Sequence, residues 1–139
     1  MKGRSYMRIS IRVLSALSAL FMGTILSSCG SDGKQIKNEY KQITVEEAKR
    51  IMDEESGFVI LDVRRQDEYD SGHIPGAVLL TNESIGSGEI PALPDKSQKI
   101  LVYCRSGNRS KQAANKLADL GYTNVYEFGG INDWPYEIE

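Results

Sequence analysis

The chain has 139 residues with 17 basic and 19 acidic side chains, and it contains one histidine and two cysteines. These residues cannot supply the usual nitrogen and sulfur ligand sets of a zinc site, so we expect no metal site. No cofactor is expected either. Residues 1–28 hold four of the basic residues and no acidic one, so the remaining chain carries a formal charge of −6, which argues against nucleic acid as a partner.

The N-terminus has the organisation of a bacterial lipoprotein signal peptide. A basic start precedes an apolar run at residues 13–26, which is shorter than the roughly 20 residues of a membrane-spanning helix. Residues 26–29, Leu-Ser-Ser-Cys, then resemble a lipobox. We therefore expect residues 1–28 to be a signal peptide and residues 29–39 to be the lipidated Cys29 with a flexible tether. An uncleaved anchor, or an ordinary signal peptide with an accidental cysteine, is the alternative.

The mature protein is thus expected to be exported and held on a bacterial membrane by lipid, facing the periplasm or the cell surface. With Cys29 lipidated, Cys104 is the only thiol, so no internal disulfide can form. A lone thiol in an exported protein is either buried and inert or reactive.

From residue 40 the pattern predicts one domain of alternating strands and helices. In chain order we expect a short edge strand at 40–43, a helix at 44–55, a strand at 58–63, a short helix at 65–71, a strand at 77–80, a polar crossover with a helical turn or two at 81–98, a strand at 100–103, a helix at 110–120 and a strand at 125–128. Thr44 and Glu47 have the spacing of a capping box, and Gly72 and Gly121 suit helix ends. This alternation implies a parallel sheet covered on both faces, which binds ligands at the carboxyl ends of its strands.

Cys104 lies at such a strand end, where a short polar loop leads into a helix that is expected to begin at Ser110. Free loop N–H groups and the positive end of the helix dipole favour negative charge there. Arg105 and Arg109 add positive charge, and all three effects favour a reactive thiolate. Cys104 is therefore the candidate nucleophile, and the alternative is an inert core cysteine. The candidate substrate-binding residues are Arg105, Ser106, Gly107, Asn108, Arg109 and Ser110.

The two arginines are expected to have different tasks, which the sequence does not assign. One would face an anionic donor, and the other would brace the loop against a carboxylate, for which Asp62 is the natural candidate. Asp62 and Arg64 lie beside the end of the second strand, where we expect a supporting ion pair rather than contact with substrate. Gly107 is expected to allow a backbone conformation or a close approach that a Cβ would prevent.

Residues 104–109 resemble the active-site loop of the rhodanese-type sulfurtransferases, Cys-Arg-x-Gly-x-Arg. Three further segments resemble motifs of that family in the same order. They are residues 59–64 with an Asp-x-Arg ending, residues 68–77 with a Gly-His-Ile-Pro-Gly-Ala signature, and residues 129–134 with a closing glycine pair and tryptophan. The resemblance covers roughly Ile43 to Trp134.

This resemblance implies a rhodanese-like α/β domain at residues 40–139, with a central parallel five-stranded sheet and helices on both faces. It also implies that His73, in the turn of the signature, stabilises the fold and is not a catalytic base. Trp134 is expected to pack in the core or to act as a plug over it.

The activity implied by the resemblance is that of a thiosulfate sulfurtransferase. Cys104 would take a sulfane sulfur from thiosulfate, polysulfide or a persulfide donor and pass it, as a persulfide, to cyanide or a thiol. No second thiol can resolve the persulfide, so the acceptor must be external. No oligomeric state is indicated.

Two other functions remain as alternatives. The first is a phosphatase or arsenate reductase on the same fold, which the loop length disfavours. Tyrosine phosphatases place the arginine six positions after the cysteine, where this chain has Ser110, and phosphatases on the rhodanese fold have a loop one residue longer. The second is a non-catalytic module that binds a persulfide or a partner, which the presence of Cys104 disfavours.

Overall fold

The computed structural model describes residues 38–86 and 88–139. The expected signal peptide, Cys29 and all but the last two residues of the expected tether lie outside the described residues. Within the described ranges, no helix is both long and apolar enough to cross a membrane.

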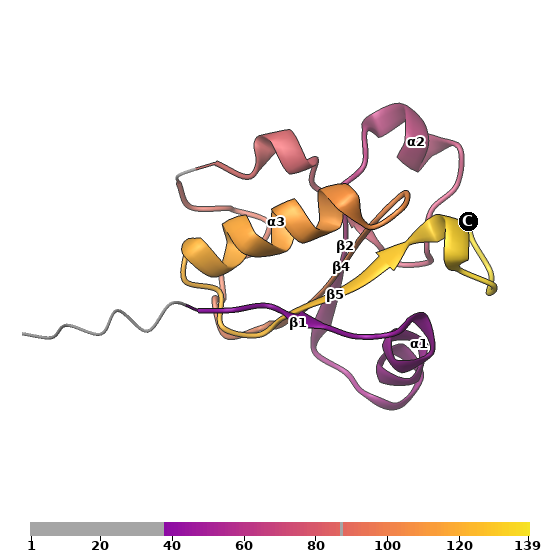
Figure 1. The fold of residues 1–139 in the computed structure, drawn as a ribbon, viewed down its shortest axis with the longest axis horizontal. Helices are drawn as coiled ribbons and strands as arrows, with labels where there is room; N and C mark the ends of the chain where they lie inside the picture. Colours follow the sequence, from indigo (N-terminus) through magenta and orange to yellow (C-terminus); the bar gives the residue numbers. More distant parts are fainter. Residues whose placement is uncertain (1–37, 87) are drawn as a thin grey trace, which may run out of the picture. The chain divides into compact units, whose positions relative to one another are not determined.

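One parallel sheet of five strands forms the centre of the domain, in the order β1-β5-β4-β2-β3 (Figure 1). The strands are β1 (Lys41–Gln42), β2 (Phe58–Asp62), β3 (Val78–Leu79), β4 (Lys99–Cys104) and β5 (Val125–Gly130). The predicted five-stranded parallel sheet is confirmed. The central strands β4 and β2 are apolar except for Lys99 at the start of β4 and Asp62 at the end of β2, because a parallel strand inside such a sheet is covered on both faces.

The helices are α1 (Val45–Glu54), α2 (Gln66–Asp70) and α3 (Asn108–Asp119), with 3₁₀ turns η1 (Asn82–Ser84) and η2 (Ile131–Asp133). Thr44 caps α1 as predicted, since its Oγ1 accepts a hydrogen bond from the Glu47 N–H at 3.1 Å. In its described residues, the expected crossover contains a single helical turn, η1.

Most element boundaries lie within one residue of the prediction, but two differ by two residues, and both of these lie at the Cys104 loop. The helix α3 begins at Asn108, two residues before the expected start at Ser110, because Gly107 at φ 97° turns the chain directly into the helix. The strand β5 continues two residues beyond Phe128. An irregularity between Val102 and Cys104 brings Gly130 opposite Cys104 in the register of β4 and β5.

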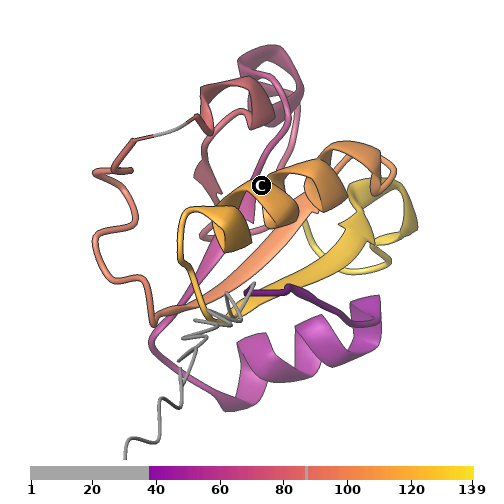
Figure 2. The same cartoon turned by 60° about the vertical axis from the view of Figure 1, so that its left-hand side comes forward.

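Helices cover both faces of the sheet, as predicted, with α1 on one face and α3 on the other (Figures 1 and 2). Consecutive residues of β4 alternate between two buried clusters. Ile100, Val102 and Cys104 pack with α3, whereas Leu101 and Tyr103 pack with α1. This alternation of side chains along a strand directs the Cys104 sulfur toward α3 and the Tyr103 ring away from it.

Candidate active site

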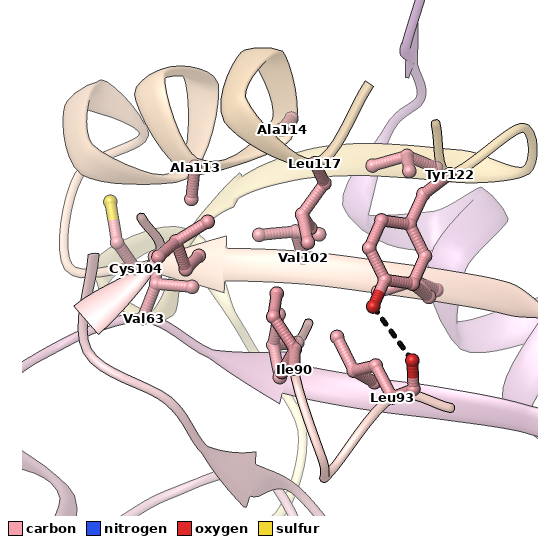
Figure 3. Close-up of a cluster of buried hydrophobic side chains, with 13 residues drawn as sticks. Val63, Ile90, Leu93, Val102, Cys104, Ala113, Ala114, Leu117 and Tyr122 are labelled. Atoms are coloured by element: carbon pink, nitrogen blue, oxygen red, sulfur yellow. Dashed lines mark hydrogen bonds between the residues drawn. The ribbon is translucent and has the colours of Figure 1, made fainter. Parts of the chain in front are cut away.

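The Cys104 side chain lies at the carboxyl end of β4 and belongs to the buried hydrophobic cluster that packs against α3 (Figure 3). Its sulfur points toward the first turn of that helix (Figure 3). Only 1% of the residue is exposed. The N–H of Gly107 donates a hydrogen bond to Sγ at 3.0 Å. The strand end and the helix start thus hold the sulfur between them, in a position where negative charge is favoured.

The pKa of Cys104 is lowered from its ordinary value. Burial acts in the opposite direction, but the polar groups around the sulfur outweigh it, namely the nearby Ser110 hydroxyl and the N–H groups of Ser110, Gly107 and Ser106. The thiolate form of Cys104 is therefore more populated than that of a free cysteine, and the thiolate is the nucleophilic form.

The two glycines at the end of β5 are required for different reasons. A Cβ atom at Gly130 would lie 2.1 Å from the carbonyl oxygen of Arg105, so no side chain fits there. Gly129 has open space around it but adopts φ 94°, which residues with a Cβ rarely adopt. The same Arg105 carbonyl accepts a hydrogen bond from the Asn132 N–H at 3.1 Å. The glycine pair that the sequence marked only as a motif therefore lets β5 support the curvature of the loop.

Arg109 is the arginine that braces the loop, and its partner is Glu68. The guanidinium donates to both carboxyl oxygens of Glu68, from NH1 to Oε2 at 2.7 Å and from NH2 to Oε1 at 2.8 Å. The expectation that Asp62 would be this partner was wrong, because Asp62 is held elsewhere. The segment that resembles the family signature begins at Glu68, and this was the one sequence signal that could have pointed to it.

Arg105, in contrast, is exposed and forms no ion pair with any residue that the structure describes. Ser106 and Asn108 are exposed beside it, while Gly107 and Ser110 are buried. The loop therefore presents one free guanidinium to an approaching anion.

Asp62 and Arg64 form the ion pair that the sequence suggested, and it is buried. Arg64 donates from Nε to Oδ1 at 3.0 Å and from NH2 to Oδ2 at 2.7 Å. The Tyr103 hydroxyl donates to the same Oδ2 at 2.6 Å and accepts from the Ile74 N–H at 3.1 Å. Arg64 also donates to the Gly72 carbonyl at 2.7 Å. This network ties the 72–74 turn to the sheet and uses Tyr103, whose side chain lies on the face opposite Cys104.

The His73 side chain is held by contacts with Tyr69 and Glu139. Its ring stacks on Tyr69 with 3.7 Å between the ring centroids, and its Nδ1 lies 3.1 Å from the Tyr69 carbonyl oxygen. Its Nε2 lies 3.6 Å from a carboxyl oxygen of Glu139. These contacts agree with the expected role in the fold. Trp134 packs in the cluster beneath α1, as a core residue.

Ser110 connects the loop to a residue that sequence reasoning missed. Its Oγ lies 2.6 Å from Oε1 of Glu127, 3.0 Å from the Gly107 carbonyl oxygen and 3.2 Å from that of Gly129. Glu127 is an acidic residue within a strand and is fully buried. An acidic side chain at an inward-facing strand position is unusual, and that was the available signal.

No other part of the described chain offers comparable chemistry. Among residues 38–86 and 88–139, no group of three His, Cys, Asp or Glu side chains could hold a metal ion. A cavity of about 780 Å³ lies beside α1 and the start of β2, where Met52, Phe58 and Trp134 line it, and no residue of the Cys104 loop does.

The Glu68–Arg109 contact predicts a stability change in acid. Hydrogen bonds from Arg109 lower the pKa of Glu68 from 4.5 to about 2, although burial acts in the opposite direction. The Arg65 N–H and the guanidinium charges of Arg109 and Arg65 also lower this pKa. Between these two pH values the Glu68 carboxylate binds a proton more readily in the unfolded chain than in the folded protein. The stabilisation of the folded protein by the Glu68–Arg109 contact is therefore fully present above pH 4.5 and is lost as the pH falls to about 2.

We expect the free energy of unfolding of Glu68→Gln to fall less steeply than that of the unaltered protein between these two pH values. Urea titrations at several pH values measure it. Glu54→Gln, which alters an exposed pair with Arg50, should keep the steeper dependence. Equal slopes for Glu68→Gln and the unaltered protein would contradict the assignment.

Comparison with known proteins gives a consistent result. The model of the rhodanese-like domain family matches residues 44–136. Thiosulfate sulfurtransferase PspE of Escherichia coli (strain K12) is 36% identical over 73 residues, which are 52% of this chain and 70% of that protein. Thiosulfate sulfurtransferase GlpE of Pseudomonas savastanoi is 37% identical over 97 residues, which are 69% of this chain and 88% of that protein.

A solved structure shows the same fold. The rhodanese-like domain of a protein from Anabaena, determined in solution, has a TM-score of 0.64 and 31% sequence identity, with 70% of this chain and 77% of that chain covered. The family model spans more than half of the chain, and GlpE, which is 37% identical, is covered over 88% of its length. The chain therefore belongs to the rhodanese-like domain family.

Proposed function

We propose that this rhodanese-type sulfurtransferase moves a sulfane sulfur from thiosulfate, polysulfide or another persulfide donor to cyanide or a thiol, with a Cys104 persulfide as intermediate. The observation that carries the proposal is the Cys104 sulfur itself, which receives the Gly107 N–H at 3.0 Å and has a lowered pKa. Relatives named thiosulfate sulfurtransferase support the choice of donor.

The first step loads the sulfur. The Cys104 thiolate attacks the outer sulfur of thiosulfate, a new S–S bond forms to Sγ, and the S–S bond of thiosulfate breaks as sulfite leaves with the electron pair. The persulfide that results carries one negative charge on its outer sulfur. Loop N–H groups that already face Sγ are suited to bind this charge, in the way that an oxyanion hole binds a developing oxyanion.

The second step discharges the sulfur. Cyanide or a thiolate attacks the outer sulfur, the S–S bond to Cys104 breaks, and Cys104 returns as a thiolate while thiocyanate or a new persulfide leaves. Neither step consumes a net proton, so no histidine base is needed, and His73 faces Tyr69. Cys104 is the one free cysteine in the described part of the chain, which fits release to an external acceptor.

Arg105 is the residue that we assign to the anionic end of the donor. The guanidinium of Arg109 is already paired with Glu68, whereas Arg105 is exposed and unpaired among the described residues. The chain from residue 29 is acidic overall, so the attraction of a sulfur anion has to come from such a local charge.

A membrane anchor at Cys29 belongs to the same proposal. The basic start, the apolar run at residues 13–26 and the lipobox-like residues 26–29 support it. Several acyl chains on Cys29 would exceed the two signals that stable anchoring requires. The sulfurtransferase domain, which we place at residues 40–139, would then act at a membrane surface outside the cytoplasm.

Persulfide formation is the first test. After thiosulfate, alkylation and tryptic digestion of the full chain, the peptide of residues 100–105 should carry one additional sulfur atom, which cyanide removes as thiocyanate in equal amount. Cys104→Ser should gain no sulfur. A reactive Cys104 that takes no sulfur, in a protein that hydrolyses an aryl phosphate, would instead support the phosphatase alternative. A Cys104 that no alkylating agent reaches would leave a binding module.

Arg105→Ala should raise the KM for thiosulfate about tenfold, because a hydrogen-bonded contact between charged groups is lost at an exposed site. Steady-state assays with cyanide as acceptor measure it, and the effect should shrink as salt is added. Arg50→Ala removes an exposed arginine on α1 and should leave KM unchanged. An unaltered KM in Arg105→Ala would remove Arg105 from donor binding.

Lipidation can be measured directly. In cells that express the full chain, the protein should incorporate a labelled fatty acid. The protein should also be found in the membrane fraction, because acyl chains partition into the bilayer. Cys29→Ser should abolish both results, and Cys104→Ser should change neither. Label that persists in Cys29→Ser would rule out this anchor.

A further inference from the structure

Glu127 is a fully buried acidic residue of β5 that the two displacement steps do not use. Its Oε1 accepts two hydrogen bonds, from the Ser110 hydroxyl at 2.6 Å and from the Gly129 N–H at 2.8 Å. Its Oε2 is buried and has no hydrogen-bond partner among the described residues. Burial of a carboxyl group with an unpaired oxygen is unfavourable, so the position of Glu127 requires an explanation.

The Ser110 hydroxyl has only one proton to donate. Three oxygens lie within hydrogen-bond distance of it, and the shortest distance, 2.6 Å to Glu127, is in the range of a charge-assisted bond. The same hydroxyl lies close enough to the Cys104 sulfur to lower its pKa, although its hydrogen bonds in the structure go to these oxygens and not to Sγ. Since one proton cannot serve both acceptors, Glu127 competes with the Cys104 sulfur for it.

Few other charges act at this point. Arg109 of α3 lies near enough to interact with the Cys104 charge, but Glu68 of α2 pairs with it and Glu83 of η1 also acts on it. On β2 and β4, the Asp62, Arg64 and Tyr103 network involves the face that packs with α1. The remaining charge, Arg105 of the loop, is exposed. Among the described residues, Glu127 is therefore the one acidic group with a buried hydrogen bond to a side chain that neighbours the sulfur.

We propose that Glu127 is a positioning residue that draws the Ser110 hydroxyl proton away from Cys104 and so limits how strongly the loop stabilises the thiolate. The functional consequence of this role of Glu127 rests on the proposed sulfur transfer. The nucleophilicity of a thiolate falls with its pKa, with a Brønsted coefficient of about 0.4–0.5, whereas a thiolate of lower pKa is the better leaving group. Glu127 therefore favours loading of sulfur onto Cys104 and slows its release.

The first experiment measures the pH dependence of Cys104 alkylation by iodoacetamide in the full chain. Trypsin releases Cys104 in the peptide of residues 100–105, so Cys29 does not interfere. Glu127→Gln should lower the midpoint by about one pH unit, a tenfold change, because about one net hydrogen bond is returned to the thiolate. The exposed control Glu137→Gln should not move the midpoint. An unchanged or raised midpoint in Glu127→Gln would overturn the proposal.

Ser110→Ala separates the hydroxyl from a direct effect of the carboxyl charge. In the double variant, Glu127→Gln should no longer lower the midpoint, because no hydroxyl remains to turn toward sulfur. An equal shift with and without Ser110→Ala would show that Glu127 acts by charge alone and would overturn the proposal. If Glu127→Gln does not fold, Ser110→Ala alone decides. Its alkylation midpoint is expected to lie within about half a pH unit of that of the unaltered protein. A rise of a full unit would mean that the hydroxyl donates to sulfur, and would overturn the proposal.

The second experiment times the two half-reactions above both midpoints. In Glu127→Gln, persulfide formation from thiosulfate should slow about threefold, as the Brønsted coefficient gives for one pH unit, and discharge by cyanide should accelerate. Slowing of both half-reactions would indicate structural damage and count against the proposal. If the unaltered protein takes no sulfur, the proposed function fails, yet the alkylation midpoints still decide the role of Glu127.

Discussion

The close packing of the end of β5 against the Cys104 loop is the constraint on which the rest of the site depends. The space at Gly130 is so small that a Cβ atom would lie 2.1 Å from the Arg105 carbonyl oxygen. The extension of β5 to Gly130, opposite Cys104, brings it there. Because the loop is supported from this side, the chain can turn at Gly107 and direct its N–H at the sulfur, and α3 can begin at once.

The two faces of the sheet divide the structural and the chemical tasks between neighbouring residues of one strand. Tyr103 turns to the α1 face, where its hydroxyl joins Asp62 and helps to hold the turn of residues 72–74. Cys104 turns to the α3 face, where the loop surrounds its sulfur. Both the histidine and the buried Asp62–Arg64 ion pair serve the fold, so the chemistry depends on the loop and on what lies beneath it.

Charge around the sulfur is balanced and not simply positive. Glu68 neutralises Arg109, Arg105 remains free at the surface, and Glu127 lies buried below Ser110. A thiol that alternates between nucleophile and leaving group needs a compromise, since strong stabilisation of its charge helps one step and hinders the other. In the proposed function the donor anion would meet the free guanidinium of Arg105 at the surface, while the sulfur itself is stabilised mainly by N–H dipoles.

The sequence by itself determined the strands, the Cys104 loop and the ion pair of Asp62 and Arg64, because apolar runs, turn residues and pairs two positions apart are local features. It placed the start of α3 two residues late, since the conformation of Gly107 depends on the strand packed beside it. The tertiary structure alone decided the partners of the loop. Glu68 lies 41 residues before Arg109, and Glu127 lies 17 residues after Ser110. Only the folding of α2 and β5 against the loop brings these groups within hydrogen-bond distance.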